Sequence, residues 1–207
     1  ATSATRDASN RDEFLGGVKK RLGVPVQVLS GDEEAGTSFA GAASVMGVDG
    51  PSPVIVVDLG GGSTEVVLGE LGQGVVTDYS MNVGCVRMHE RHMISDPAGA
   101  DEIAAARSDV NAALDEAEAR VDFGSARGLV GLAGTVTTLT ARALGLQKYD
   151  ASRIHGTELS VARVVEVCEW FIHSSKAERD ALGYMHPGRS DVMASGALVW
   201  EEVVKRV

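Results

Sequence analysis

Aromatic side chains are scarce in this sequence, at 4% of its 207 residues. This scarcity disfavours a surface for single-stranded nucleic acid, because such surfaces stack bases on aromatic rings. Positive charge is also short: 19 Lys and Arg stand against 29 Asp and Glu, which leaves a net charge of −10. Non-specific DNA binding depends on neutralising phosphates. We therefore expect no DNA partner, and a polyanionic ligand only at a locally arranged site.

Cysteine is also rare, and long apolar runs and a leader-like segment are not found in this sequence. Only Cys85 and Cys168 occur, and neither has a CxxC partner, which favours a reducing, cytoplasmic location. The longest apolar run, residues 53–57, is far too short to span a bilayer, and no charged-then-apolar leader is present. We therefore expect no membrane contact. The chain begins at Ala1 without a methionine, and we expect it to be a fragment.

The composition suits an ordinary folded core, with 44% hydrophobic residues and a mean hydropathy of +0.03. Period-two and β-branched patterns predict strands, whereas helical spacing predicts helices. The predicted strands cover residues 24–29, 54–58, 64–70, 75–79, 82–86 and 128–132. The predicted helices cover residues 14–22, 35–45, 97–121, 135–144, 158–173, 177–182 and 189–207, and a turn-rich loop covers 47–53. Strands that first form a meander and then alternate with helices indicate an α/β fold.

The most informative stretch reads DLGGGSTE over residues 58–65, and we name it the first glycine loop. Its glycines permit positive φ and let main-chain N–H groups approach an anion closely. Asp58 and Glu65 flank the turn, where they can hold a divalent cation directly or through water. The loop is neither a Walker A motif, which needs a lysine, nor a dinucleotide fingerprint, which needs strand followed by helix. A plain glycine hairpin without a ligand is the alternative.

A second glycine loop reads GLAGTVTT over residues 131–138. Here a strand does run into a glycine turn and then a helix, whose N-terminal amides can form an anion site. Threonines in this loop can cap the helix or donate to a ligand. A capped helix without a ligand is the alternative.

A turn rich in carboxylates reads SGDEEA over residues 30–35. Carboxylates on one turn can serve as a general base or as metal ligands. Acidic residues are also favoured in a first helical turn because they complement the helix dipole, so simple capping is the stronger alternative from the residues alone. Further along, Arg189 and Asp191 are expected to pair across a helix start, with a substrate-channel role for Arg189 as the weaker alternative.

Three segments together resemble the exopolyphosphatase/guanosine pentaphosphate phosphohydrolase family of the actin/Hsp70/sugar-kinase superfamily: VIVVDLGGGSTEVVLGE, VQVLSGDEEAG and GLAGTVTTLTA. The resemblance covers nearly the whole chain, because two further segments are similar to segments of the family: ATSATRDASNRDEFL and HPGRSDVMASGALV. It implies a ribonuclease H-like α/β lobe with a mixed five-stranded sheet flanked by helices. The family's upstream DxGSNS-like loop is missing. Residues 1–32 are therefore expected to be the remainder of the first lobe and residues 33–207 the second lobe, and the chain alone is expected to be inactive.

The resemblance implies removal of terminal phosphate from polyphosphate, or of the 5′-γ-phosphate from guanosine pentaphosphate, with Mg²⁺ as cofactor. It places the catalytic base at Glu34, a catalytic or metal-coordinating carboxylate at Glu65 and a metal ligand at Asp58. It implies phosphate binding by Gly60, Gly61, Gly62, Ser63, Thr64, Gly134, Thr135 and Arg6. Polyphosphate or guanosine penta- or tetraphosphate is the expected partner, and a homodimer is possible in this family. Two alternatives stay open: a kinase-like ATP user, and a non-catalytic module that binds polyphosphate or the nucleotide.

Overall fold

The computed structural model describes residues 1–46 and 50–207, so the loop predicted over 47–53 lies partly outside the described residues. The strands are β1 (Val54–Leu59), β2 (Thr64–Glu70), β3 (Gly74–Met81) and β4 (Leu129–Leu132). The helices are α1 (Ser3–Asp7), α2 (Arg11–Leu22), α3 (Gly31–Met46), α4 (Cys85–Arg91), α5 (Ala100–Glu118), α6 (Ala133–Ala143), α7 (Ala151–Ile154), α8 (Val161–His173), α9 (Lys176–Asp180) and α10 (Met193–Arg206). Two 3-10 turns are η1 (Phe123–Ser125) and η2 (Ser190–Val192).

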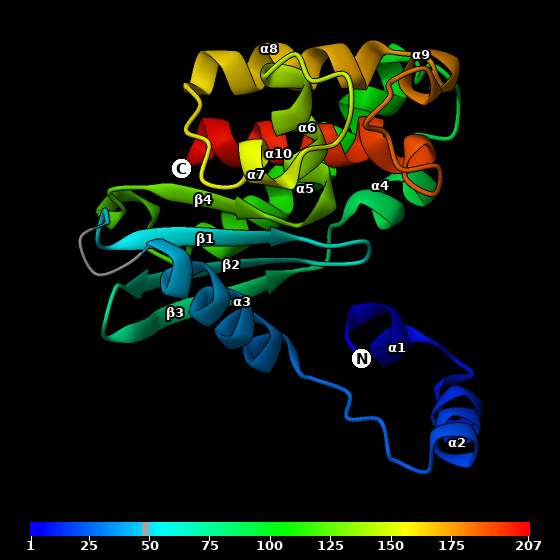
Figure 1. Ribbon diagram of the computed structural model, residues 1–207, viewed down its shortest axis with the longest axis vertical. Helices are drawn as coiled ribbons and strands as arrows, with labels where there is room; N and C mark the ends of the chain where they lie inside the picture. Colours follow the sequence, from blue (N-terminus) through cyan, green and yellow to red (C-terminus); the bar gives the residue numbers. More distant parts are fainter. Residues whose placement is uncertain (47–49) are drawn as a thin grey trace.

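The four strands form one mixed sheet in the order β3-β2-β1-β4, as Figure 1 shows. Strand β1 pairs antiparallel with β2, and β2 pairs antiparallel with β3, which confirms the predicted meander. Strand β4 pairs parallel with β1. The expected count of five strands is wrong. Residues 24–29 run outside the sheet, with Val24 exposed, although their sequence is rich in β-branched residues. Pro25 has no N–H to donate to a ladder, and Leu29 donates its N–H to the carbonyl of Ala1 at 2.9 Å.

The strand predicted over 82–86 is also wrong, because α4 begins at Cys85. Short apolar runs fit strands and helices equally well by periodicity alone. Here the first N–H groups of α4 find acceptors in the first glycine loop: Cys85 donates to the Gly60 carbonyl at 3.0 Å and Val86 to the Gly61 carbonyl at 2.9 Å. A tertiary contact therefore decides the local structure.

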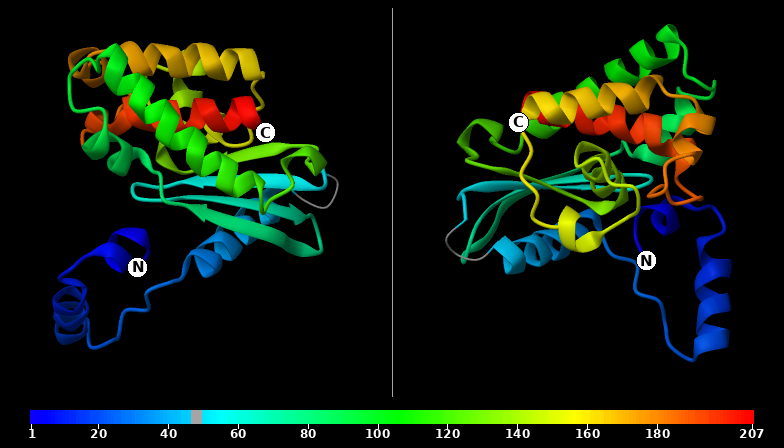
Figure 2. Two further views of the ribbon diagram at one scale, coloured as in Figure 1. Left: turned by 180° about the vertical axis from the view of Figure 1, so that it is seen from behind. Right: turned by 45° about the horizontal axis from the view of Figure 1, so that its top comes forward.

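The sheet separates two helical layers (Figures 1 and 2). One face is covered by α3, whose Ala35, Phe39 and Ala42 pack against Val54, Val56 and Val67. The other face carries the larger core with α4, α5, α6, α8 and α10. Strand β1 is therefore buried on both faces, which explains its uninterrupted VIVV run.

The parallel pairing of β1 with β4 determines where the two glycine loops lie. Asp58 at the end of β1 is in register with Leu132 at the end of β4. Both loops therefore leave the carboxyl edge of neighbouring strands, the edge at which open α/β sheets bind ligands.

The N-terminal residues lie apart from these layers. Helix α2 buries no residue, and in Figures 1 and 2 it stands away from the sheet, whereas α1 lies nearer to it. The predicted domain boundary at residue 32 falls within the first turn of α3, and this division stays a prediction. None of the described helices has the length and apolar character needed to cross a membrane.

Candidate functional site

The first glycine loop is a tight hairpin turn in which the carbonyl groups of residues 60–63 accept hydrogen bonds. Gly60 donates its N–H to the Ser63 carbonyl at 3.0 Å, and the Gly60 and Gly61 carbonyls accept the first N–H groups of α4. Within residues 1–46 and 50–207, the N–H groups of Gly61, Gly62 and Ser63 have no hydrogen-bond acceptor. Successive main-chain N–H groups without an acceptor are suited to binding an oxyanion. The turn thus has the main-chain N–H donors that the sequence predicts for an anion.

The hydroxyl of Thr64 is not one of these donors. It is fully buried and donates to the Val83 carbonyl at 2.7 Å. The Thr64 side chain therefore stabilises the hairpin. Although Thr64 is among the residues predicted to bind phosphate, its side chain faces the interior of the protein.

Arg87 of α4 connects the turn to helix α1. Its Nε donates to the Gly62 carbonyl at 2.7 Å, and its Nη2 contacts the Asp7 carboxylate at 2.5 Å. Ser3 of α1 lies so close to Gly62 that a Cβ added there would be 2.6 Å from the Ser3 Oγ. A larger residue at position 62 would therefore require the side chain of Ser3 to shift, and α1 lies against the turn.

The two contacts of Arg87 can be separated by mutation. We expect Asp7→Asn to lower the free energy of unfolding by no more than about 1 kcal/mol, because the ion pair is partly exposed and screened. Arg87→Met also removes the bond to the Gly62 carbonyl and should cost more. Denaturant unfolding of both variants measures the difference. Equal losses would contradict a role for Arg87 in holding the turn.

The second glycine loop carries an arginine that the sequence did not assign to it. Ala133 has a left-handed φ of 71°, and α6 begins there. The Arg189 guanidinium lies over Gly134, with Nη1 3.4 Å from the Gly134 carbonyl, and a Cβ at Gly134 would be 2.2 Å from Cζ. The expected Arg189–Asp191 pair is absent among the described residues, since Asp191 contacts Lys176 at 3.7 Å instead. Arg189 thus brings positive charge to the start of a helix that is already suited to anions.

The Thr135 side chain is buried and packs against α10. It is 2% exposed, and its hydroxyl lies where a Cβ at Gly196 would be 2.8 Å away. It also hydrogen-bonds Cys85, whose thiol pKa is raised by burial while Thr135 and Arg189 oppose the shift. Only the main-chain N–H of Thr135 is left for a ligand.

Glu34 and Arg6 form an ion pair on the α3 side of the site. Arg6 Nη1 donates to Glu34 Oε2 at 2.9 Å and to the Leu29 carbonyl at 2.7 Å. Arg6 lies on α1, the same helix whose Ser3 contacts Gly62. Helix α1 therefore joins the carboxylate turn to the first glycine loop, and Arg6 orients Glu34.

Asp58 and Glu65 lie opposite each other at the end of the β1–β2 hairpin. Asp58 accepts the Ser38 hydroxyl at 2.5 Å, and Glu65, 1% exposed, accepts the Ser80 hydroxyl at 2.8 Å. Burial raises the pKa of Glu65 above its ordinary 4.5, and the negative charges of Glu34 and Asp58 raise it further. Hydrogen bonds from serine side chains oppose the shift only in part. Glu34 and Asp58 are thus both close enough to Glu65 to act on its charge.

The raised pKa of Glu65 makes stability depend on pH in a defined direction. Because the folded state binds this proton more tightly than the unfolded state, the stabilisation is present below pH 4.5 and is lost as pH rises through the folded pKa. Glu65→Gln removes the titration. We therefore expect its free energy of unfolding, relative to wild type, to increase from acid to neutral pH in metal-free buffer. Urea unfolding at a series of pH values measures this, and a constant difference would contradict the assignment.

With the loops and carboxylates placed, comparison with known proteins identifies the family. The model of the Ppx/GppA phosphatase family matches residues 1–207. The chain belongs to this family. It is 45% identical over 212 residues to Exopolyphosphatase 2 of Mycobacterium tuberculosis, a match that covers 100% of the chain and 66% of that protein. It is also 31% identical to the bifunctional 3-dehydroquinate synthase/phosphatase of Fusobacterium nucleatum, of which 30% is covered.

Solved Ppx/GppA structures agree with this fold. The crystal structure of an exopolyphosphatase-like protein matches with a TM-score of 0.96 at 47% identity, covering 100% of this chain and 66% of that one. The Aquifex aeolicus family member matches with a TM-score of 0.83 at 28% identity, covering 100% and 65%. The predicted family and the α/β, actin-like fold class are confirmed, apart from the strand count. The chain spans 66% of the length of its curated mycobacterial relative.

Two cavities found among the described residues of this Ppx/GppA chain lie away from its glycine loops. One, of about 530 Å³, lies at the end of α6 and is lined by residues that include Arg142, Trp170 and Tyr184. The other, of about 240 Å³, is lined by residues that include His89 and Arg179. Neither cavity is lined by a residue of the two glycine loops.

Proposed function

We propose that this chain carries the phosphate site of a hydrolase that releases terminal phosphate from inorganic polyphosphate by attack of water. One observation carries the proposal: two glycine loops leave adjacent parallel strands at one edge of the sheet, with free amides in the first and Arg189 over the second. The exopolyphosphatase name of the mycobacterial relative supports this substrate. The 5′-γ-phosphate of guanosine pentaphosphate has the same terminal anhydride bond and is the alternative substrate.

The residues divide the chemistry among them. Phosphoryl transfer to water needs an oriented nucleophile and donors for the equatorial oxygens. Glu34 would orient the water and accept its proton, because Arg6 engages only its Oε2 among the described contacts. Amides of the first glycine loop, together with Arg189, would bind the non-bridging oxygens.

Asp58 and Glu65 fit a magnesium ion. Glu65 is buried beside the charges of two other carboxylates, and no salt bridge compensates it in the part of the chain that the structure describes. The described residues contain no group of three or more His, Cys, Asp or Glu side chains able to hold a metal, but Mg²⁺ typically takes one or two carboxylates plus water and phosphate oxygens. When bound, the ion would supply positive charge for the phosphate oxygens.

Magnesium binding has a test that does not need turnover. We expect Mg²⁺ to raise the melting temperature of the intact protein at neutral pH, because a ligand that binds only the folded state stabilises it. Asp58→Asn should lose most of this shift. Glu70→Gln, a carboxylate at the other end of β2, should keep it. A shift that persists in Asp58→Asn would contradict the assignment.

The function is tested by phosphate release from polyphosphate with no acceptor present. Release by the intact protein supports a hydrolase, whereas binding without release favours the non-catalytic module that binds polyphosphate or the nucleotide. Transfer only to an added acceptor favours a kinase-like enzyme. The same assay with guanosine pentaphosphate separates the two substrates. Homodimer formation and a cytoplasmic location stay predictions.

A further inference from the structure

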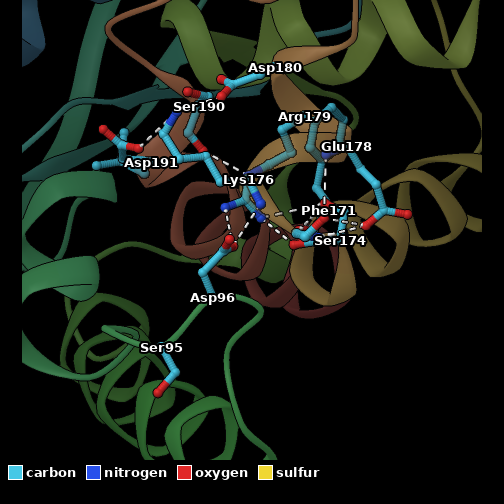
Figure 3. A network of polar contacts seen from close by, with 12 residues as sticks. Ser95, Asp96, Phe171, Ser174, Lys176, Glu178, Arg179, Asp180, Ser190 and Asp191 are labelled. Atoms are coloured by element: carbon cyan, nitrogen blue, oxygen red, sulfur yellow. Dashed lines mark hydrogen bonds and ion pairs between the residues drawn. The ribbon is translucent and has the colours of Figure 1, made fainter.

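Arg179 is the most buried arginine side chain outside the proposed phosphate site. It lies on α9, is 4% exposed, and directs its donors to three different segments (Figure 3). Its Nε donates to the Ser190 carbonyl at 2.7 Å, its Nη1 to the Ser174 carbonyl, and its Nη2 to the Asp96 carboxylate at 3.2 Å. Burying a guanidinium is costly unless every donor is satisfied, so this arrangement fixes three segments relative to one another.

One of these segments carries Arg189. Ser190, whose carbonyl Arg179 holds, follows Arg189 directly and is fully buried. The backbone on both sides is also fixed: Arg189 donates its N–H to the His186 carbonyl at 2.9 Å, and Val192 donates to the Arg189 carbonyl at 3.1 Å. The main chain of Arg189 is thus hydrogen-bonded on both sides, and from this position its side chain reaches Gly134.

Another segment leads back to the first glycine loop. Asp96 follows α4, the helix whose first N–H groups bind the Gly60 and Gly61 carbonyls. Asp96 also accepts the main-chain N–H of Lys176 at 2.7 Å. The Arg179 network therefore joins the helix that holds one glycine loop to the segment that supplies an arginine to the other.

We propose that Arg179 is a positioning residue that holds Arg189 against the second glycine loop and thereby sets the affinity for the terminal phosphate. The phosphate part of this inference rests on the proposed function. A lysine cannot replace Arg179, because one ammonium group lacks the planar fork that reaches three acceptors in different directions.

The first test compares Arg179→Met, Arg189→Ala and the double variant, using tripolyphosphate as substrate of the intact protein. We expect Arg179→Met to raise KM by up to about 100-fold with kcat close to wild type. If Arg179 acts through Arg189, the double variant should show no larger loss than Arg189→Ala alone. The proposal would be overturned if the increases in KM of the two single variants multiplied in the double variant. A wild-type KM in Arg179→Met would also overturn it.

A core truncation controls for general destabilisation. Leu114→Ala on α5 removes a fully buried side chain and should lower the melting temperature without raising KM. If Arg179→Met fails to fold, Arg179→Lys takes its place, and we expect it to reproduce the rise in KM. A wild-type KM in the lysine variant would overturn the proposal.

A second test needs no activity. The Nε–Hε NMR signal of Arg189 reports whether its guanidinium is fixed, and we expect it to be ordered in wild type and Leu114→Ala but averaged in Arg179→Met. An ordered signal in Arg179→Met would refute the positioning role. If the wild-type protein released no phosphate, the proposed function would be refuted, but the NMR measurement would still test the positioning role. Failure of the proposed function and failure of the positioning role are therefore distinguishable.

Discussion

Glu34→Gln is expected to lower kcat for phosphate release by about 10²- to 10⁴-fold, the contribution of a positioned general base, with KM close to wild type. Glutamine has the shape of glutamate, and its Oε1 can still accept the Arg6 Nη1 hydrogen that Glu34 Oε2 accepts at 2.9 Å. The substitution therefore preserves the contact with α1 and removes only the ability to take a proton from water. Steady-state kinetics of phosphate release from polyphosphate measures both constants.

The neighbouring carboxylate provides a matched control. Glu33 is exposed on the same turn, and its Oε2 accepts the main-chain N–H of Ser30 at 2.8 Å, so it caps the start of α3. We expect Glu33→Gln to keep wild-type kinetics. Near-normal turnover in Glu34→Gln would refute the assignment of Glu34 as the base.

Local patterns allowed much of the fold to be predicted. The helix predicted over 97–121 is α5, whose five apolar residues at helical spacing are buried. They are Ile103, Ala106, Val110, Leu114 and Ala117. The glycine hairpin and the helix after the second glycine loop were likewise predictable. In each case the residues that determine the structure lie within one helix or one turn.

The contacts that build the site were less accessible to sequence reasoning. Arg87 and Asp7 are 80 residues apart, and Arg189 and Gly134 are 55 apart. Pairing of this kind depends on the register of β4 beside β1 and on where α4 begins, which no local pattern contains. The burial of the Thr135 side chain could not be predicted for the same reason, because it depends on how α10 packs against α6.

Gly84→Ala is expected to displace the first glycine loop. A Cβ at Gly84 would lie 2.6 Å from the Gly61 carbonyl oxygen, 2.7 Å from its carbon and 2.8 Å from the Gly60 carbonyl oxygen. All three are backbone atoms, so the turn itself must move. The backbone of Gly84 is extended, with φ −161° and ψ 168°, a conformation that any residue adopts. The effect is therefore one of space and not of backbone strain.

The expected consequence is a displaced turn whose amides no longer converge on the phosphate oxygens. Overpacking of this kind costs about 1–3 kcal/mol of stability, and loss of one oxyanion donor typically costs about 10²–10³ in kcat. We therefore expect Gly84→Ala to fold and to lose at least about 100-fold in kcat for phosphate release.

Gly36→Ala separates this effect from the general cost of an added methyl group. Gly36 lies on α3, two residues from Glu34, and a Cβ added there would meet no heavy atom within 4 Å among the described residues. Alanine there should add about 0.5–1 kcal/mol to stability, because it removes the entropy cost of a helical glycine, and should leave kcat unchanged. If Gly84→Ala lost stability but retained wild-type kcat, the first glycine loop would be a structural hairpin, because its displacement would not have reached the reacting phosphate.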